Sequence, residues 1–154
     1  MKCFYHKADF DGKCSGYIVS TKYPAVELIP INYNEEYDLS QIPYGETVFV
    51  VDFSFPPEDM KKLAEHCNLV WIDHHISAIN SSKDPKHKYD HLCEGIRKDG
   101  VAACQLCWEY FFPDKKLPQF VYLLACYDVW KINETPNVLP FQYGMRLKES
   151  NILY

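Results

Sequence analysis

The chain has 154 residues, which fits one domain that is large enough to bury an apolar core. Hydrophobic residues make up 47% of it, so the composition indicates a globular chain and excludes an intrinsically disordered one. The net charge of −5 comes without a basic stripe, which argues against sequence-specific binding of duplex DNA.

Nothing in the sequence indicates a membrane protein or a secreted one. No apolar run approaches the roughly 18 residues that a membrane span needs, and the N-terminal apolar patch is too short for a signal peptide. Seven cysteines are an odd number, and without a secretory signal they favour reduced thiols. We therefore expect a soluble cytoplasmic protein that does not contact a membrane.

The first half of the chain alternates between apolar strands and helical segments. In order, it predicts a strand at 2–6, a helix at 12–22, strands at 26–31 and 47–52, a helix from 56 to about 66, and a strand at 68–73. The 47–52 segment is apolar and β-branched almost throughout, as expected of a strand that is buried on both faces.

The second half is less regular. Residues 77 to about 99 are polar and show no clear pattern, whereas 100–112 and 117–127 are long apolar stretches that predict helices. Strands separated by helices indicate an α/β fold, with a Rossmann-like, mostly parallel sheet that carries helices on both faces.

Three of the predicted strands end in acidic or imidazole side chains: His6 ends the first, Asp52 the third, and Asp73, His74 and His75 the fourth. Ligands of parallel sheets bind beyond the carboxyl ends of the strands, so we expect these groups to meet at one edge. Along a strand neighbouring side chains alternate, but at its end the chain turns. One histidine of the pair is then free to bind a metal ion while the other contacts a substrate.

The loop after the first strand adds two carboxylates, in the pattern His6-x-x-Asp9-x-Asp11. Carboxylate oxygens with some imidazole suit Mn²⁺ or Mg²⁺, and the absence of thiolate partners argues against a structural zinc site. An alternative is that Asp9 and Asp11 only cap the helix that follows.

These segments together resemble a known family, the DHH phosphoesterase superfamily. Its four motifs are matched in order by His6-x-x-Asp9-x-Asp11-Gly12, Val50-Val51-Asp52, Asp73-His74-His75 and Asp128. The resemblance covers residues 3 to about 131. Residues 100–103 and 125–130 look most like the branch of oligoribonucleases and cyclic-nucleotide phosphodiesterases.

The resemblance implies two Mn²⁺ ions, with Mg²⁺ as a possible replacement. It assigns one ion to His6, Asp9 and Asp52, and the other to Asp11, Asp52, His74 and Asp128, so that Asp52 bridges them. It further implies that Asp73 orients His74 and that His75 faces the phosphate. The implied activity is hydrolysis of phosphodiester bonds in short oligonucleotides or cyclic (di)nucleotides by two-metal activation of water, without a covalent enzyme intermediate.

The resemblance also predicts how the chain is organised. Residues 1–132 correspond to the DHH catalytic domain, and 133–154 to a linker or C-terminal extension. The family's second domain, of the DHHA1 type, has no counterpart, so we expect either that the chain is a fragment of a two-domain enzyme or that another copy or a partner completes the site. Candidate substrate contacts are Ser15, whose alternative role is helix capping, and Arg146, whose alternative is a surface position.

The same residues permit other interpretations. Asp9-Phe10-Asp11-Gly12 resembles the opening of haloacid dehalogenase-like phosphatases, but Lys13 departs from that pattern and no Asp-Asp pair follows. A phosphate-binding P-loop is excluded because position 7 is Lys7 instead of glycine. The remaining functional alternatives are a non-catalytic metal or nucleotide sensor, a partner-binding module, and a pyrophosphatase-type phosphoanhydride hydrolase.

Overall fold

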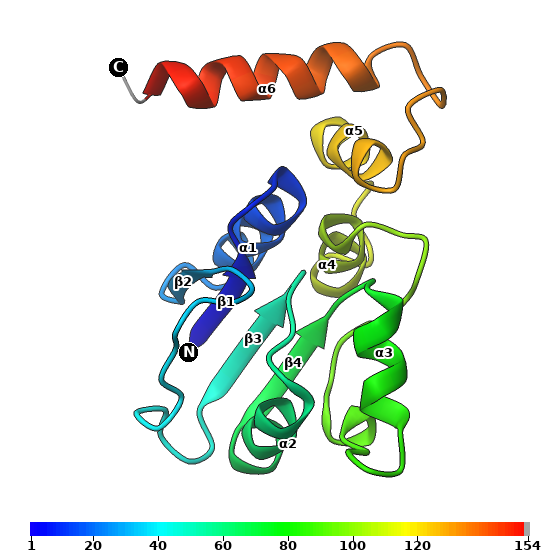
Figure 1. Cartoon of the computed structure of the whole chain (residues 1–154). Helices are drawn as coiled ribbons and strands as arrows, with labels where there is room; N and C mark the ends of the chain where they lie inside the picture. Colours follow the sequence, from blue (N-terminus) through cyan, green and yellow to red (C-terminus); the bar gives the residue numbers. More distant parts are fainter. Residues whose placement is uncertain (153–154) are drawn as a thin grey trace.

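Four parallel strands form one sheet in the computed structural model, which describes the backbone of residues 1–152 (Figure 1). The sheet order is β2-β1-β3-β4, with the strands at β1 (Lys2–His6), β2 (Glu27–Ile31), β3 (Thr47–Val51) and β4 (Asn68–Ile72). All of these pairings are parallel. The predicted α/β fold with a Rossmann-like sheet is therefore confirmed.

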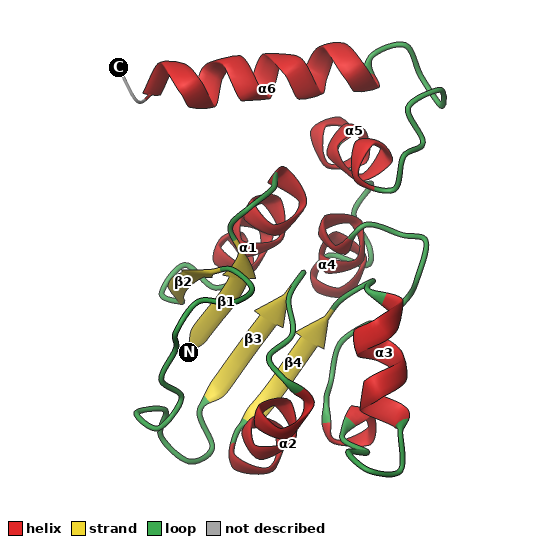
Figure 2. Cartoon of the chain, viewed as in Figure 1, coloured by secondary structure: helices red, strands yellow, loops and turns green. Residues whose placement is uncertain are grey.

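Helices cover both faces of this sheet, as the sequence predicted (Figure 2). They are α1 (Phe10–Lys22), α2 (Pro57–His66), α3 (Ile76–Lys83), the 3₁₀ helix η1 (Asp90–Leu92), α4 (Ala103–Phe111), α5 (Gln119–Asp128) and α6 (Val138–Ile152). The helices α1 and α4 cover one face with α5 packed against both, and α2 covers the other. None of the helices among the described residues is long and apolar enough to cross a membrane.

The central strand β3 explains the continuous apolar run in the sequence. Phe49 and Val51 pack in the core beneath α1 and α4, and Val48 and Val50 pack in the core beneath α2. All of these side chains are almost completely removed from solvent. A strand in this position needs no polar face, which is why its sequence does not alternate.

Gly12 lets α1 begin directly behind the end of β1. A Cβ atom at this position would lie 2.0 Å from the carbonyl oxygen of His6, which no side chain permits. Close approach of α1 to the strand holds Asp9 and Asp11 at the carboxyl edge of the sheet. Gly12 thus serves the placement of the acidic loop and not merely its flexibility.

Two segments contain helices that the sequence pattern did not specify. The 77–99 region, which showed no clear pattern, follows the start of α3 and contains η1. Residues 138–152, within the segment expected to be a linker or extension, form α6, which packs on α5 through Val138 and Phe141 (Figure 1). Residues 153 and 154 of that segment lie outside the described part of the chain.

Candidate metal centre

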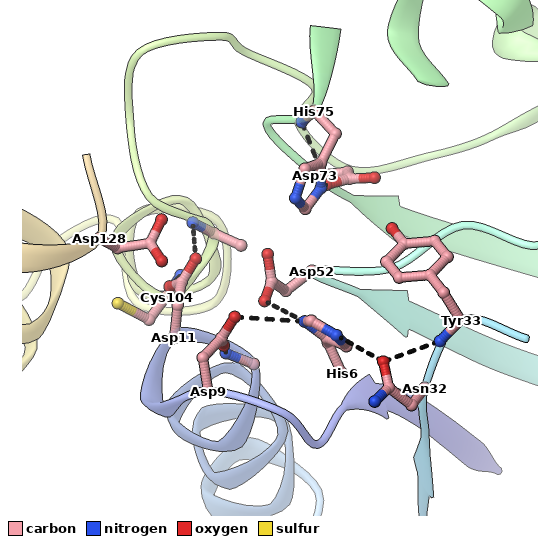
Figure 3. A network of polar contacts seen from close by, with 12 residues as sticks. His6, Asp9, Asp11, Asn32, Tyr33, Asp52, Asp73, His75, Cys104 and Asp128 are labelled. Atoms are coloured by element: carbon pink, nitrogen blue, oxygen red, sulfur yellow. Dashed lines mark hydrogen bonds and ion pairs between the residues drawn. The ribbon is translucent and has the colours of Figure 1, made fainter. Parts of the chain in front are cut away.

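The acidic and imidazole side chains singled out in the sequence meet at the carboxyl edge of the sheet (Figure 3). Three groups have ligand atoms within 4.8 Å of one another: His6, Asp9 and Asp52; Asp11, His74 and Asp128; and Asp52, His74 and His75. Every residue predicted as a metal ligand belongs to one of these groups.

Asp52 lies at the middle of this cluster and directly after β3. It is only 1% exposed, and neither carboxylate oxygen has a hydrogen-bond partner among the described residues. One oxygen lies 3.5 Å from Nδ1 of His6 and the other 3.2 Å from Nε2 of His74. Because a buried carboxylate without donors is costly, this arrangement is the one expected of a ligand shared between two cations.

The backbone of Asp52 is also unusual. Its φ of 52° lies in the left-handed region, which a non-glycine residue rarely adopts. Such conformations cost on the order of 1–3 kcal/mol and cluster at functional sites. The turn after β3 therefore orients this carboxylate toward both histidines at a cost in folding free energy.

His6 is held in place by a residue that the sequence did not single out. Asn32 Oδ1 lies 3.1 Å from Nε2 of His6, so this ring nitrogen donates and Nδ1 is left facing the carboxylates. Nδ1 lies 3.3 Å from Asp9 Oδ2. No sequence signal marks Asn32, which follows β2 and reaches His6 only because the two strands are paired.

The second group gathers around His74. Its Nε2 lies 3.5 Å from Asp11 Oδ2 and 3.4 Å from Asp128 Oδ2, besides its contact with Asp52. Asp128 is the last residue of α5, and Asp11 lies in the first turn of α1. Helices far apart in the sequence thus deliver their carboxylates to one imidazole.

The electrostatics of the cluster show how strongly it favours positive charge. The neighbouring carboxylates, Asp52 first and then Asp9, raise the pKa of His6 to about 10. Burial opposes the charge of His74, yet the neighbouring carboxylates, Asp52 first, raise its pKa to about 9. Burial, with the charge of Asp52, raises the pKa of Asp11 to about 7. The cluster therefore retains protons that bound cations would replace.

The capping alternative holds for Asp9 but not for Asp11. Asp9 is the N-cap of α1 and accepts a hydrogen bond of 2.9 Å from the Gly12 backbone N–H. Asp11 instead accepts from the backbone N–H groups of Ala103, at 2.9 Å, and Cys104, at 2.7 Å, where α4 begins. Each carboxylate thus anchors a helix and still faces the cluster.

Asp73 was expected to orient His74, and this expectation is wrong because the side chain contacts the His75 ring instead. Its Oδ1 lies 2.6 Å from Nδ1 of His75, whereas it receives only the backbone N–H of His74, at 2.8 Å. The reason is the turn after β4, which folds the His75 ring back over Asp73 and sends the His74 ring toward Asp52. Asp73 orients His75, and its hydrogen bond raises the pKa of that imidazole.

The two predicted substrate contacts differ. Ser15 is 0% exposed in the second turn of α1, so both substrate contact and helix capping are wrong for it, since α1 is capped by Asp9. Arg146 is an exposed residue of α6 whose Nη2 donates to Tyr127 Oη at 2.8 Å. It lines a cavity of about 160 Å³ together with Asp9 and Asp128, so it stands close to the cluster.

The cysteine pair of α4 and the aromatic residues beside it lie in the core or at its margin. Cys104 and Cys107 are completely buried, Phe111 is buried, and Trp108 packs partly buried against the same core. They form no part of the metal centre.

Comparison with known proteins places the chain near one viral protein. No family model matches the sequence, and no solved structure matches it. An uncharacterized protein of Acanthamoeba polyphaga mimivirus is 31% identical over 103 residues, which cover 64% of this chain and 23% of the relative. The chain thus matches less than a quarter of the relative's length, and a function must be argued from the site itself.

Proposed function

We propose that this chain is a metal-dependent phosphoesterase of the DHH type that hydrolyses phosphodiester bonds in short oligonucleotides or cyclic (di)nucleotides. The observation that carries the proposal is Asp52. Its buried oxygens lack hydrogen-bond donors and lie within 3.5 Å of His6 and 3.2 Å of His74, one from each of two ligand groups. A bridging carboxylate is what a two-cation site requires.

The donor set fits two divalent cations. His6 and Asp9 would hold one, Asp11, His74 and Asp128 the other, and Asp52 both. Carboxylate and imidazole donors without thiolates suit Mn²⁺, with Mg²⁺ as the alternative. When bound, such cations neutralise phosphate oxygens and lower the pKa of a water molecule enough to make it a nucleophile at neutral pH.

His75 and Asp73 then serve the substrate. The His75 side chain is 39% exposed at the mouth of the site, and its Nδ1 is held by Asp73 at 2.6 Å. With Nδ1 engaged, Nε2 is the atom free to donate a hydrogen bond to a phosphate oxygen. The buried carboxylate of Asp73 fixes the ring in this orientation and favours its protonated form.

The proposal also covers the cellular location of the chain and its partners. All seven cysteines are free thiols, which suits the reducing cytoplasm. As the resemblance to the DHH superfamily implies, a second copy, a further domain or a partner would complete the binding of the substrate.

The test is Mn²⁺-dependent release of nucleoside monophosphate from short oligoribonucleotides, from the dinucleotide pApA and from cyclic dinucleotides. We expect turnover by the wild-type chain, none by Asp52→Asn, and undiminished turnover by the control Asp114→Asn, which removes an exposed carboxylate of the loop after α4.

Two outcomes would contradict the proposal. A chain that binds two Mn²⁺ yet hydrolyses none of these substrates, nor pyrophosphate, is a sensor or binding module. Failure to bind any divalent cation would remove the metal centre itself.

A further inference from the structure

A groove with aromatic walls opens beside the metal centre. We call it the aromatic groove and define it by Tyr33, Tyr37, Phe53, Phe55 and His75. Its volume of about 530 Å³ lies within the range of small-molecule sites. Figure 3 shows Tyr33 on the side of Asp52 that faces away from Asp128.

Buried phenylalanines support the exposed tyrosines of this groove. The Tyr33 ring packs on Phe53 with a centroid separation of 4.7 Å and a tilt of 35°, and Tyr37 packs on Phe55 at 4.7 Å. Phe53 and Phe55 are buried and touch each other, whereas Tyr33 remains 42% exposed. Tyr33 is thus a ring that is supported from one side and still has accessible surface.

The groove is built onto the metal centre. Asn32 Oδ1, which contacts Nε2 of His6, also accepts the backbone N–H of Tyr33 at 2.8 Å. The Tyr33 ring lies 5.4 Å from the ring of His6 and 6.4 Å from that of His75. A group attached to a phosphate at the metal centre would therefore come to lie next to Tyr33.

Apart from His75, which faces the metal centre, the groove offers no cationic side chain among its described residues for a second phosphate. Its lining, among the described residues, includes no lysine and no arginine. Glu35 on its rim is ion-paired with Lys7 at 2.6 Å. Hydroxyl groups of Ser54 and Ser81 supply hydrogen-bonding capacity without charge. Such a surface suits an uncharged planar ring with polar edges.

We propose that the aromatic groove binds the nucleobase of a nucleotide whose phosphate lies at the metal centre, with the base stacked on Tyr33. The inference rests on the proposed function and narrows it, because pyrophosphate would leave this groove empty. Stacking on an aromatic ring tolerates every base, so we expect little preference among the four.

Binding of adenosine to the metal-free protein tests the groove separately from catalysis. Saturation-transfer NMR would compare adenosine with ribose on the wild-type chain, on Tyr33→Ala and on Tyr33→Phe. The control is Tyr44→Ala, which removes an 82% exposed tyrosine that does not line the groove. Because Tyr33→Ala loses support for the loop, Ser81→Trp, which fills the groove, serves as a second blocking variant.

We expect adenosine, but not ribose, to bind the wild-type chain, Tyr33→Phe and Tyr44→Ala. Tyr33→Ala and Ser81→Trp should weaken it at least about fivefold, the loss expected for one stacked base. Adenosine that fails to bind the wild-type chain, or binds both blocking variants unchanged, would overturn the inference. Mn²⁺-dependent hydrolysis is measured on the same samples. Its absence while adenosine still binds through Tyr33 would count against the proposed function alone.

Discussion

The two sides of the metal centre are built from opposite materials. On the side of α1 and α5, Asp11 and Asp128 bring two carboxylates, one buried and one partly exposed, to His74. On the side of the loop after β2, Tyr33 and Phe53 present an uncharged aromatic surface. The first side suits cations and lacks an aromatic surface for a nucleobase. The second suits a nucleobase and lacks metal-ligating side chains. Asp52 and His6 lie between these two sides.

Substitution of the shared carboxylate should break this division most severely. Asp52→Asn keeps the size of the side chain and tolerates the left-handed backbone, but removes the charge that both ligand groups face. We expect activity to fall by at least about 10³-fold, since several kcal/mol of charge stabilisation is lost. Steady-state hydrolysis of pApA measures this.

The same variant should still fold, because the loss of a buried charge offsets the loss of the ion pairs that Asp52 makes with His6 and His74. Its melting temperature without metal should therefore lie close to that of the wild-type chain. A marked fall would mean that Asp52 serves the fold and that its position in the cluster is incidental.

The two carboxylates of the first loop separate metal binding from helix anchoring. Asp9→Asn and Asp11→Asn should each remove one cation. Asparagine caps α1 as well as aspartate does, and the contact of Asp9 with His6 is partly exposed to solvent, so Asp9→Asn should lose less than about 1 kcal/mol. Asp11→Asn can satisfy only one of the Ala103 and Cys104 N–H groups and should lose about 1–2 kcal/mol.

Chemical denaturation of the metal-free proteins reads out this difference. Equal stability of the two variants would show that the bonds from Asp11 to α4 contribute nothing measurable.

Removal of the substrate-facing imidazole should leave the cations in place. We expect His75→Ala, and Asp73→Asn through the loss of its bond to His75, to lower kcat about 10–100-fold. Calorimetric titration should still find two Mn²⁺ per chain. Loss of one cation in His75→Ala would instead identify His75 as a ligand, in the group that it forms with Asp52 and His74.

The smallest effect concerns pH. The folded-state pKa of His6 is raised from 6.5 to about 10, so its contribution to stability is complete below pH 6.5 and disappears as the pH rises toward 10. Burial and Asp11 raise the pKa of Asp128 to about 7, and this carboxyl also stabilises the metal-free fold less as the pH rises. The metal-free melting temperature should therefore fall from about pH 6 to about pH 8.5.

Cations compete with the same protons, so the stabilisation by Mn²⁺ should increase over this interval. Thermal scans with EDTA and with Mn²⁺ measure both trends. A Mn²⁺ shift that decreases with pH would contradict ligation by His6 and His74.

The sequence was most informative where the chain is locally regular. Strands β1 and β3 and the helix from Pro57 to His66 could be placed because apolar runs and proline signal them directly. The α3 helix, ISAINSSK, was not predicted because it has no side-chain cap and few apolar positions. The ligand residues could be found because strand ends converge in a parallel sheet.

Contacts between distant segments could not be read from the sequence. The capping of α4 by Asp11 joins positions 92 apart in the chain, and Asn32 reaches His6 only through strand pairing. The partner of Asp73 depends on how a turn directs two adjacent rings. Tyr33 lies in a loop without periodicity, so nothing in the pattern distinguishes it from the other tyrosines.

The central claim is that Asp52 joins two cation sites. It is tested most directly by titrating Mn²⁺ into the wild-type chain and Asp52→Asn, while the electron paramagnetic resonance spectrum is recorded. The account predicts two Mn²⁺ per wild-type chain with spin-coupled lines, as expected of ions about 3.5–4 Å apart, and loss of the coupling in the variant. A single ion, or two uncoupled ions in the wild-type chain, would contradict it.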